Sequence, residues 1–277
     1  MSLVQMNFES VYLGNNTNIN IILPDKPRQI SPDDFYGGNP KYKVLWLLHG
    51  TFGDYSDWVR KTNIERYACE KDLMVVMPSA MNSNYVNWPK FGMGFNMWDF
   101  MTKELMPMIY GWYPASSKRE DNFIAGLSMG GRGTATFAFS HPELFAGAAI
   151  LSASPVQYTE EVLQGGGNGM GNRTAICVEN AGGPEGFLAS PENVWDIAKK
   201  QLDAGVELPR LYFTCGGDDT RVASNLAIWK EYADSIGLEA TYKVVPGYRH
   251  EWRFWDLAIQ DAMTFFGLTV RDAGNPF

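Results

Sequence analysis

The sequence predicts an α/β fold, in which a mainly parallel central sheet of about eight strands begins with an antiparallel hairpin and is covered by helices on both faces. Three observations favour this fold. Short apolar segments alternate with longer amphipathic ones along most of the chain, as in successive βαβ units. Several of the short segments are apolar throughout, which is typical of strands buried on both faces. The first two segments instead alternate in polarity, as antiparallel strands with one exposed face do.

The N-terminal elements are an expected hairpin and a first buried strand. Residues 8–13 and 18–23 alternate between polar and apolar side chains, and the link Gly14-Asn15-Asn16-Thr17 is short enough to join them as antiparallel strands. Residues 24–41 are polar and contain several prolines and glycines, so we expect a loop there. Residues 44–48 (Val-Leu-Trp-Leu-Leu) predict a strand buried on both faces.

Helices and strands then alternate through the rest of the chain. We expect helices at about 58–71, 96–110, 131–138, 222–236 and 254–266, and strands at 73–77, 122–125, 146–151, 211–215 and 240–245. The regularity is lost between about 155 and 190. The glycine-rich run 165–171 lacks the preceding strand and the Gly-Lys-Ser/Thr ending of a phosphate-binding loop, so we interpret it as a flexible excursion. We expect one domain over residues 1–277 with an irregular insert at about 155–190.

The composition excludes several classes of partner. The 277 residues carry a formal net charge of −8, which argues against nucleic acid or an anionic membrane surface as a partner. No apolar stretch approaches the length of a membrane span. The start Met1-Ser2-Leu3-Val4-Gln5 has neither the charged region nor the apolar core of a signal peptide, so we expect a cytoplasmic protein unless a native leader has been removed. Cys69, Cys177 and Cys215 fit neither a disulfide framework nor a zinc cluster, which agrees with a reducing compartment.

The most informative motif is Gly126-Leu127-Ser128-Met129-Gly130-Gly131. It follows an apolar segment and precedes a run of small residues, so a strand, a sharp turn and a helix are expected in that order. This is the sequence form of a nucleophile elbow, in which a serine lies on a strained turn between small residues. We interpret Ser128 as a catalytic nucleophile.

A serine nucleophile needs a base, and the chain has only three histidines. In α/β-hydrolases the order along the chain is Ser, then Asp or Glu, then His, with the histidine in a loop after the last strand. Only His250 has that position. His49 ends the strand expected at 44–48, and His141 is expected at a helix end.

The acid and the oxyanion hole are expected in two further loops. The segment after the strand at 211–215 offers Asp218 and Asp219, and position alone does not separate them. The backbone N–H of Met129, directly after the nucleophile, is one expected oxyanion donor. The loop after the strand at 44–48 supplies the other, with Thr51 as the first candidate and Phe52 as the second.

These motifs make the chain similar to the esterase D-like family of α/β-hydrolases, and most of all to its tributyrin/acetyl esterase and cinnamoyl (feruloyl) esterase branch. The matching segments span nearly the whole chain: 7–10, 18–24, 47–53, Trp58, 62–66, 126–131, 182–185, 215–219 and 250–252. The resemblance implies the α/β-hydrolase fold and carboxylester hydrolysis through an acyl-enzyme, with no metal and no organic cofactor. It also selects Asp219 over Asp218 as the acid. The loop 24–41 and the run 165–171 depart from the family's pattern, so substrate preference and assembly do not transfer.

The expected substrate is a small-molecule ester with a short acyl or aryl acyl group, with an acylated oligosaccharide as an extension. Aromatic side chains in the loop 84–95 lie at the carboxyl end of a strand, where ligands bind in open α/β sheets. We predict Phe52, Trp88 and Trp252 as substrate-binding residues. The alternatives are an S-formylglutathione hydrolase-type thioesterase, a mycolyl-type acyltransferase and a non-catalytic binding protein on the same fold, and a homo-oligomer stays open.

Overall fold

The computed structural model of the chain describes residues 2–38, 40–159, 163 and 172–270. In this part of the chain the centre is an eight-stranded sheet with the order β1-β2-β4-β3-β7-β8-β9-β10. The hairpin strands β1 (Ser2–Ser10) and β2 (Asn15–Leu23) are antiparallel, and β2 pairs antiparallel with β4 (Leu73–Pro78). The remaining strands run parallel to β4: β3 (Lys43–Leu48), β7 (Asn122–Leu127), β8 (Gly147–Leu151), β9 (Arg210–Gly216) and β10 (Thr241–Val245). The predicted α/β fold with its N-terminal hairpin is confirmed, but the hairpin turn lies at residues 11–14 and not at the predicted link 14–17.

The burial of the strands follows their sequence patterns. Every side chain of β4 and β7 is buried, and in β3 only Lys43 is exposed. By contrast, β1 lies at an edge of the sheet and alternates between exposed and half-buried residues. Continuous apolar segments therefore became central strands, because helices cover both faces of the sheet there.

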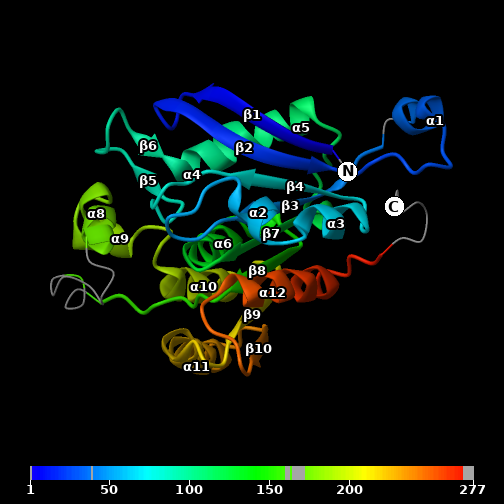
Figure 1. Cartoon of the computed structure of the whole chain (residues 1–277). Helices are drawn as coiled ribbons and strands as arrows, with labels where there is room; N and C mark the ends of the chain where they lie inside the picture. The colour runs from blue at the N-terminus through cyan, green and yellow to red at the C-terminus, as the bar shows by residue number, and fades with distance from the viewer. Residues whose placement is uncertain (1, 39, 160–162, 164–171, 271–277) are drawn as a thin grey trace.

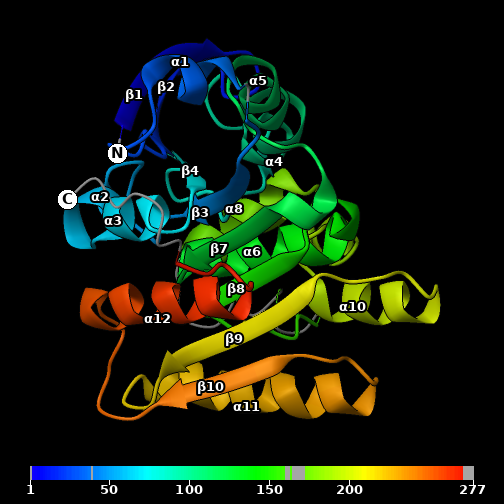
Figure 2. The same ribbon diagram turned by 90° about the vertical axis from the view of Figure 1, so that its right-hand side faces the viewer.

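Helices cover the two faces of the sheet (Figure 2). The buried side chains form two hydrophobic clusters. On one face, Trp58, Ile64, Phe254 and Ile259 contribute to a buried cluster. They belong to α2 (Asp57–Lys61), α3 (Ile64–Cys69) and α12 (Trp252–Phe265). The other face is covered by α5 (Met106–Trp112), α6 (Met129–Ser140), α10 (Val194–Asp203) and α11 (Thr220–Ser235). The segments that follow the carboxyl ends of the parallel strands lead into these helices, and they contain the residues predicted to be functional.

Two predicted helices are interrupted. The helix expected at 58–71 is α2 followed by α3, because the Thr62 hydroxyl donates to Trp58 O (2.6 Å) and accepts from Ile64 N (3.1 Å). One side chain thus ends one helix and starts the next. The helix expected at 96–110 consists of α4 (Met97–Asp99), a π-helical segment η1 (Phe100–Leu105) and α5. Pro107 lies in the first turn of α5 and has no N–H to donate, which favours a wider turn before it.

Some elements are missing from the sequence predictions. The loop expected at 24–41 contains α1 (Pro32–Gly37), whose N-cap Ser31 accepts from Asp34 N at 3.1 Å. The insert expected at 155–190 contains α8 (Asn172–Asn180) and α9 (Pro184–Leu188), beside the short pair β5 (Asn87–Trp88) and β6 (Phe95–Asn96) (Figure 1). Helix α10 was also not predicted. The run 165–171 lies outside the described residues. Of the helices described, none combines the length and the apolar composition needed to cross a membrane.

Candidate active site

Ser128 lies between β7 and α6 in a backbone conformation that few residues adopt. Its φ is 52° and its ψ is −113°, and its N–H donates to Leu151 O at 2.8 Å. The turn is tight because its neighbours pack closely. A Cβ added to Gly130 would lie 2.5 Å from Leu48 O, so only glycine fits there. This geometry is that of the predicted nucleophile elbow and directs the serine side chain away from the sheet.

His250 contacts both Ser128 and Asp219. Its Nε2 lies 2.9 Å from Ser128 Oγ, and its Nδ1 lies 2.6 Å from Asp219 Oδ2. His250 is in the loop between β10 and α12, and Asp219 directly precedes α11. The carboxylate side chain is only 9% exposed, whereas the imidazole is 36% exposed. A carboxylate can only accept hydrogen bonds, so the ring proton of neutral His250 is assigned to Nδ1. The Nε2 atom then accepts a hydrogen bond from the serine hydroxyl.

The structure separates the two adjacent aspartates. Asp218 is exposed, and its backbone N–H donates to Tyr248 O at 2.9 Å. Asp219 occupies the N-cap position of α11, but its side chain makes no capping hydrogen bond and contacts His250 instead. The aspartate that the family resemblance selected is therefore the one that the fold brings to the imidazole.

The loop after β3 approaches the elbow. A Cβ added to Gly50 would lie 3.5 Å from Ser128 Cβ, so this loop lies directly beside the nucleophile. The Phe52 N–H donates to Asn82 Oδ1 at 2.9 Å and is occupied. Thr51 thus remains the candidate oxyanion donor of this loop, together with Met129 at the first position of α6.

His49 holds the start of this loop, a role that the sequence analysis did not assign. It is buried, its Nδ1 lies 2.7 Å from Gly50 O, and its Nε2 accepts from Ala80 N at 2.9 Å. Because a carbonyl accepts and an amide N–H donates, the ring is neutral with its proton on Nδ1. Burial lowers the pKa of His49 and so favours this neutral form. The apolar segment before His49 indicated that its side chain would be buried. The hydrogen bond with Ala80 could not be predicted, because Ala80 follows a different strand, β4.

A cavity of about 100 Å³ opens beside Ser128. Its lining includes Met129, Ser152 and Tyr158, together with three arginines, Arg132, Arg173 and Arg221. None of the three arginines was predicted from the sequence. The spacing between Ser128 and Arg132 is four residues at the start of a predicted helix, so helical periodicity could have placed them on one side.

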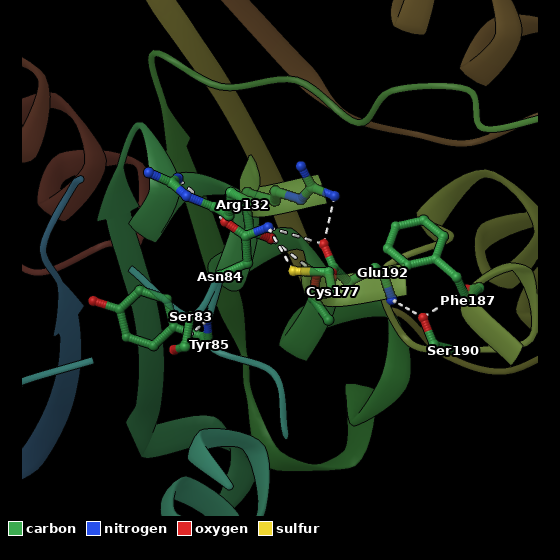
Figure 3. A network of polar contacts seen from close by, with 10 residues as sticks. Ser83, Asn84, Tyr85, Arg132, Cys177, Phe187, Ser190 and Glu192 are labelled. Carbon is green, nitrogen blue, oxygen red and sulfur yellow. Dashed lines mark hydrogen bonds and ion pairs between the residues drawn. The ribbon is translucent and has the colours of Figure 1, made fainter. Parts of the chain in front are cut away.

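Arg132 belongs to a buried polar network (Figure 3). Its guanidinium forms an ion pair with Glu192, whose carboxylate accepts from Asn84 Nδ2 at 3.2 Å. Although burial disfavours the charged form, Glu192 raises the pKa of the Arg132 guanidinium above its ordinary value. Burial and the same carboxylate raise the pKa of the Cys177 thiol well above its ordinary value. Cys177 is therefore a protonated, buried thiol and not a nucleophile.

The three predicted substrate-binding residues lie apart from this cavity. Phe52 is 91% exposed on the loop after β3, while Trp88 is only 6% exposed and belongs to a hydrophobic core. Trp252 packs edge-on against Trp58 and Trp255, with ring centroids 5.3 Å and 5.1 Å away. None of the three predicted residues lines the cavity beside Ser128. Their roles stay predictions.

The third histidine, His141, lies away from these residues. Its ring stacks on Trp98 at 5.1 Å, and its Nδ1 lies 2.8 Å from Glu143 Oε1. Within the described ranges, no group of three or more His, Cys, Asp or Glu side chains is placed to hold a metal ion.

Comparisons with known proteins show which family the chain resembles. The Esterase family model matches residues 10–266 of the chain. An acetyl esterase from Caldicellulosiruptor saccharolyticus is 29% identical over 268 residues, which cover 95% of this chain and 97% of that protein.

Solved structures extend the similarity. An S-formylglutathione hydrolase from Staphylococcus aureus superposes with a TM-score of 0.77 at 30% identity, over 96% of this chain and 98% of its own. A ferulic acid esterase from Anaeromyces mucronatus, solved in complex with ferulic acid, has a TM-score of 0.63 at 19% identity, over 97% of this chain and 90% of its own. At that identity the second structure shows a shared fold only.

Proposed function

The chain belongs to the Esterase family of α/β-hydrolases and is a carboxylic ester hydrolase, and from this premise we propose that it cleaves short acyl esters with Ser128 as nucleophile, His250 as base and Asp219 as the orienting acid. The observation that supports these roles most is the pair of hydrogen bonds made by His250. One ring nitrogen contacts the serine hydroxyl at 2.9 Å and the other contacts the carboxylate at 2.6 Å.

In the proposed acylation step, Ser128 Oγ attacks the ester carbonyl carbon. His250 Nε2 accepts the hydroxyl proton as the new C–O bond forms. The Asp219 carboxylate stabilises the resulting imidazolium through the Nδ1–H bond. The imidazolium then gives its proton to the oxygen of the leaving alcohol, and the acyl group remains on Ser128.

Deacylation repeats these steps with water. His250 takes a proton from a water molecule that attacks the acyl carbonyl, and it returns that proton to Ser128 Oγ as the acid leaves. In both steps the carbonyl oxygen becomes negative. The backbone N–H groups of Thr51 and Met129 would donate to it, and each such donor is typically worth about 100- to 1,000-fold in rate.

The size of the cavity supports a small acyl group. Pockets for drug-sized ligands have volumes of about 300–1,000 Å³, whereas the cavity beside Ser128 has about 100 Å³. Acetyl and other short chains are thus favoured over hydroxycinnamoyl groups, which need an additional binding surface. A panel of p-nitrophenyl esters from acetate to octanoate, with ethyl ferulate beside it, measures this preference as kcat/KM.

The proposed roles are tested by Ser128→Ala and His250→Ala. Each variant should lose nearly all turnover of p-nitrophenyl acetate, about a millionfold if this triad resembles well-measured ones. Circular dichroism of both variants should match that of the wild-type protein. Turnover well above the uncatalysed rate in either folded variant would mean that another nucleophile or base acts.

A thioesterase is the second candidate, because the S-formylglutathione hydrolase from Staphylococcus aureus is 30% identical over 96% of this chain. The same acyl-enzyme chemistry cleaves oxyesters and thioesters. A higher kcat/KM for S-formylglutathione than for the best oxyester would favour this candidate. The reverse order would favour the oxyesterase.

A further inference from the structure

The cavity beside Ser128 is cationic, although the chain has a formal net charge of −8. It is lined by Arg132 from α6, Arg173 from α8 and Arg221 from α11. The carboxylate of Glu192 forms an ion pair with Arg132. In the part of the chain that the structure describes, neither Arg173 nor Arg221 has an ion pair with a carboxylate. Among the described residues that line the cavity, the charged side chains are therefore all cationic.

Arg173 is half-buried, and its partners are neutral. Its Nη2 donates to Thr51 Oγ1 at 3.0 Å, and its Nη1 donates to Asn84 Oδ1 at 3.3 Å. Burial, and then repulsion from Arg132, lower the pKa of the Arg173 guanidinium. Glu192 partly offsets this effect through its charge, but among the described residues it forms its ion pair with Arg132. It is costly to keep a charge half-removed from water in this way, and a binding role gives a physical reason for it.

Asn84 keeps Glu192 apart from Arg173. Its Nδ2 donates to Glu192 Oε2 (3.2 Å) and contacts Cys177 Sγ at 3.6 Å (Figure 3). Its Oδ1 accepts from Arg173 Nη1 at 3.3 Å. The residue has a φ of +55°, a left-handed conformation that asparagine tolerates better than most residues. The one buried carboxylate of the network is thus used by Arg132 and does not form an ion pair with Arg173.

We propose that this cavity binds a carboxylate at the far end of the substrate's acyl group, and that the preferred substrates are monoesters of short dicarboxylic acids. The guanidinium fork of Arg173, with Arg221 beside it, would hold the carboxylate, because this group matches the fork in geometry and charge. The volume of about 100 Å³ limits the acyl chain to a few carbons. The inference rests on the proposed function, since it assumes that the acyl carbonyl lies between Ser128 and Met129.

A second explanation predicts a different result. Arg173 contacts the side chain of Thr51, whose backbone N–H is the proposed oxyanion donor, so it could act only by positioning that loop. In that case its loss would slow charged and uncharged esters equally. Recognition of a carboxylate would slow only the charged ester.

The test compares two ethyl esters of the same shape. Monoethyl succinate ends in a carboxylate, and ethyl succinamate ends in an uncharged carboxamide. Ethanol release gives kcat/KM for each ester. The wild-type protein should prefer the acid by roughly 10- to 100-fold, the range of a charge-assisted hydrogen bond. Arg173→Gln should reduce this ratio to near one, mainly through a higher KM for monoethyl succinate. The matched control Arg66→Gln changes a half-exposed arginine of α3 that does not line the cavity and should keep the wild-type ratio.

Other outcomes would contradict either the carboxylate proposal or the proposed function. A wild-type ratio near one, or an equal loss on both esters in Arg173→Gln, would overturn the carboxylate proposal. If the Gln variant does not fold, inhibition of wild-type ethyl acetate turnover replaces it. Butyrate should then inhibit at least ten-fold more tightly than butyramide, its uncharged analogue of the same shape, and equal inhibition would contradict the proposal. Ser128→Ala distinguishes failure of the carboxylate proposal from failure of the proposed function. Retained turnover of both esters in that variant would refute the proposed function itself.

Discussion

The side chain of His250 connects the two other residues of the proposed triad, so its orientation decides whether Ser128 can be activated. That orientation depends on one oxygen atom of Asp219, 2.6 Å from Nδ1. The adjacent Asp218 is exposed and bonds only through its backbone N–H among the contacts described. The two aspartates therefore provide a matched pair for testing the role of the carboxylate.

Asp219→Asn should lower kcat for p-nitrophenyl acetate by about 10⁴-fold, because an amide can donate to Nδ1 and stabilise the wrong tautomer. Asp218→Asn should stay within about three-fold of the wild-type protein, as expected for an exposed surface change. Steady-state kinetics at pH 8 measure both. A larger loss in Asp218→Asn would reassign the acid.

His49 makes the stability of the protein depend on pH. Burial lowers the pKa of His49 below its ordinary value of 6.5, so below that pH the unfolded chain binds a proton that the folded protein does not. The contribution of neutral His49 to the free energy of unfolding should therefore be complete above about pH 7. It should fall as the pH decreases through 6.5, by up to about 1.4 kcal/mol per pH unit for one proton.

Urea unfolding at pH 5.5 and pH 7.5 measures this dependence. His49→Gln has no ionisable ring, so its loss of stability between the two pH values should be smaller than that of the wild-type protein. His141→Gln leaves the His49 ring in place and should keep the wild-type dependence. Equal dependence in wild-type protein and His49→Gln would show that His49 takes up no proton in this range.

At the scale of elements, the site depends on how closely the start of α6 packs on the end of β3. A Cβ added to Gly130 would lie 2.5 Å from Leu48 O and 2.6 Å from His49 O, and backbone atoms cannot move aside easily. This contact fixes the distance between the nucleophile and the loop that contains Thr51. Close packing of these two elements is thus part of the proposed oxyanion hole.

Gly130→Ala should lower the free energy of unfolding by about 1–3 kcal/mol, the usual cost of overpacking, and should lower kcat as well. Gly111→Ala in α5 is the control, because nothing lies within 4 Å of a Cβ added there. That control should gain about 0.4–1 kcal/mol from the reduced freedom of the unfolded chain. Urea denaturation compares both with the wild-type protein, and a neutral Gly130→Ala would contradict the close packing.

Helices and strands could be predicted from the sequence where the local residue pattern agreed with the tertiary environment of the element. The central strands were foreseeable from continuous apolar segments, because their burial on both faces leaves no room for polar side chains. The break between α2 and α3 could not be predicted from the sequence. It depends on the hydroxyl of Thr62, which forms hydrogen bonds with the backbone instead of with water. Helix α1 had a recognisable cap in Ser31-Pro32-Asp33-Asp34, which the proline and glycine content of its surroundings obscured.

At the scale of the whole molecule, the sheet brings together residues that are far apart in sequence. Ser128, Asp219 and His250 follow β7, β9 and β10, and parallel strands present their carboxyl ends at one edge. Chain order and loop position were therefore enough to foresee this convergence. Arg173 could not be foreseen, because it belongs to α8, a helix that the sequence did not predict, and it contacts Thr51 across a separation of 122 residues.

We propose that residues 1–277 form one domain, and cooperative unfolding tests this. Tryptophans report on both faces of the sheet, with Trp58 and Trp255 in one core and Trp229 in the other. If the sheet and both layers unfold together, tryptophan fluorescence and far-ultraviolet circular dichroism should give the same midpoint in urea. Two separate transitions would indicate two units.

If Ser128 is the nucleophile, the acyl group is covalently bound to it during turnover, and this intermediate can be trapped. The protein is mixed with p-nitrophenyl acetate, quenched with acid within milliseconds, digested and mapped by mass spectrometry. We predict one acetyl group on the peptide that contains Ser128 in the wild-type protein and loss of this label as product forms. Neither Ser128→Ala nor His250→Ala should carry the label at this time, because the first lacks the nucleophile and the second lacks the base of the acylation step. An acetyl group on another residue at the rate of turnover, or turnover with no label on Ser128, would contradict the account.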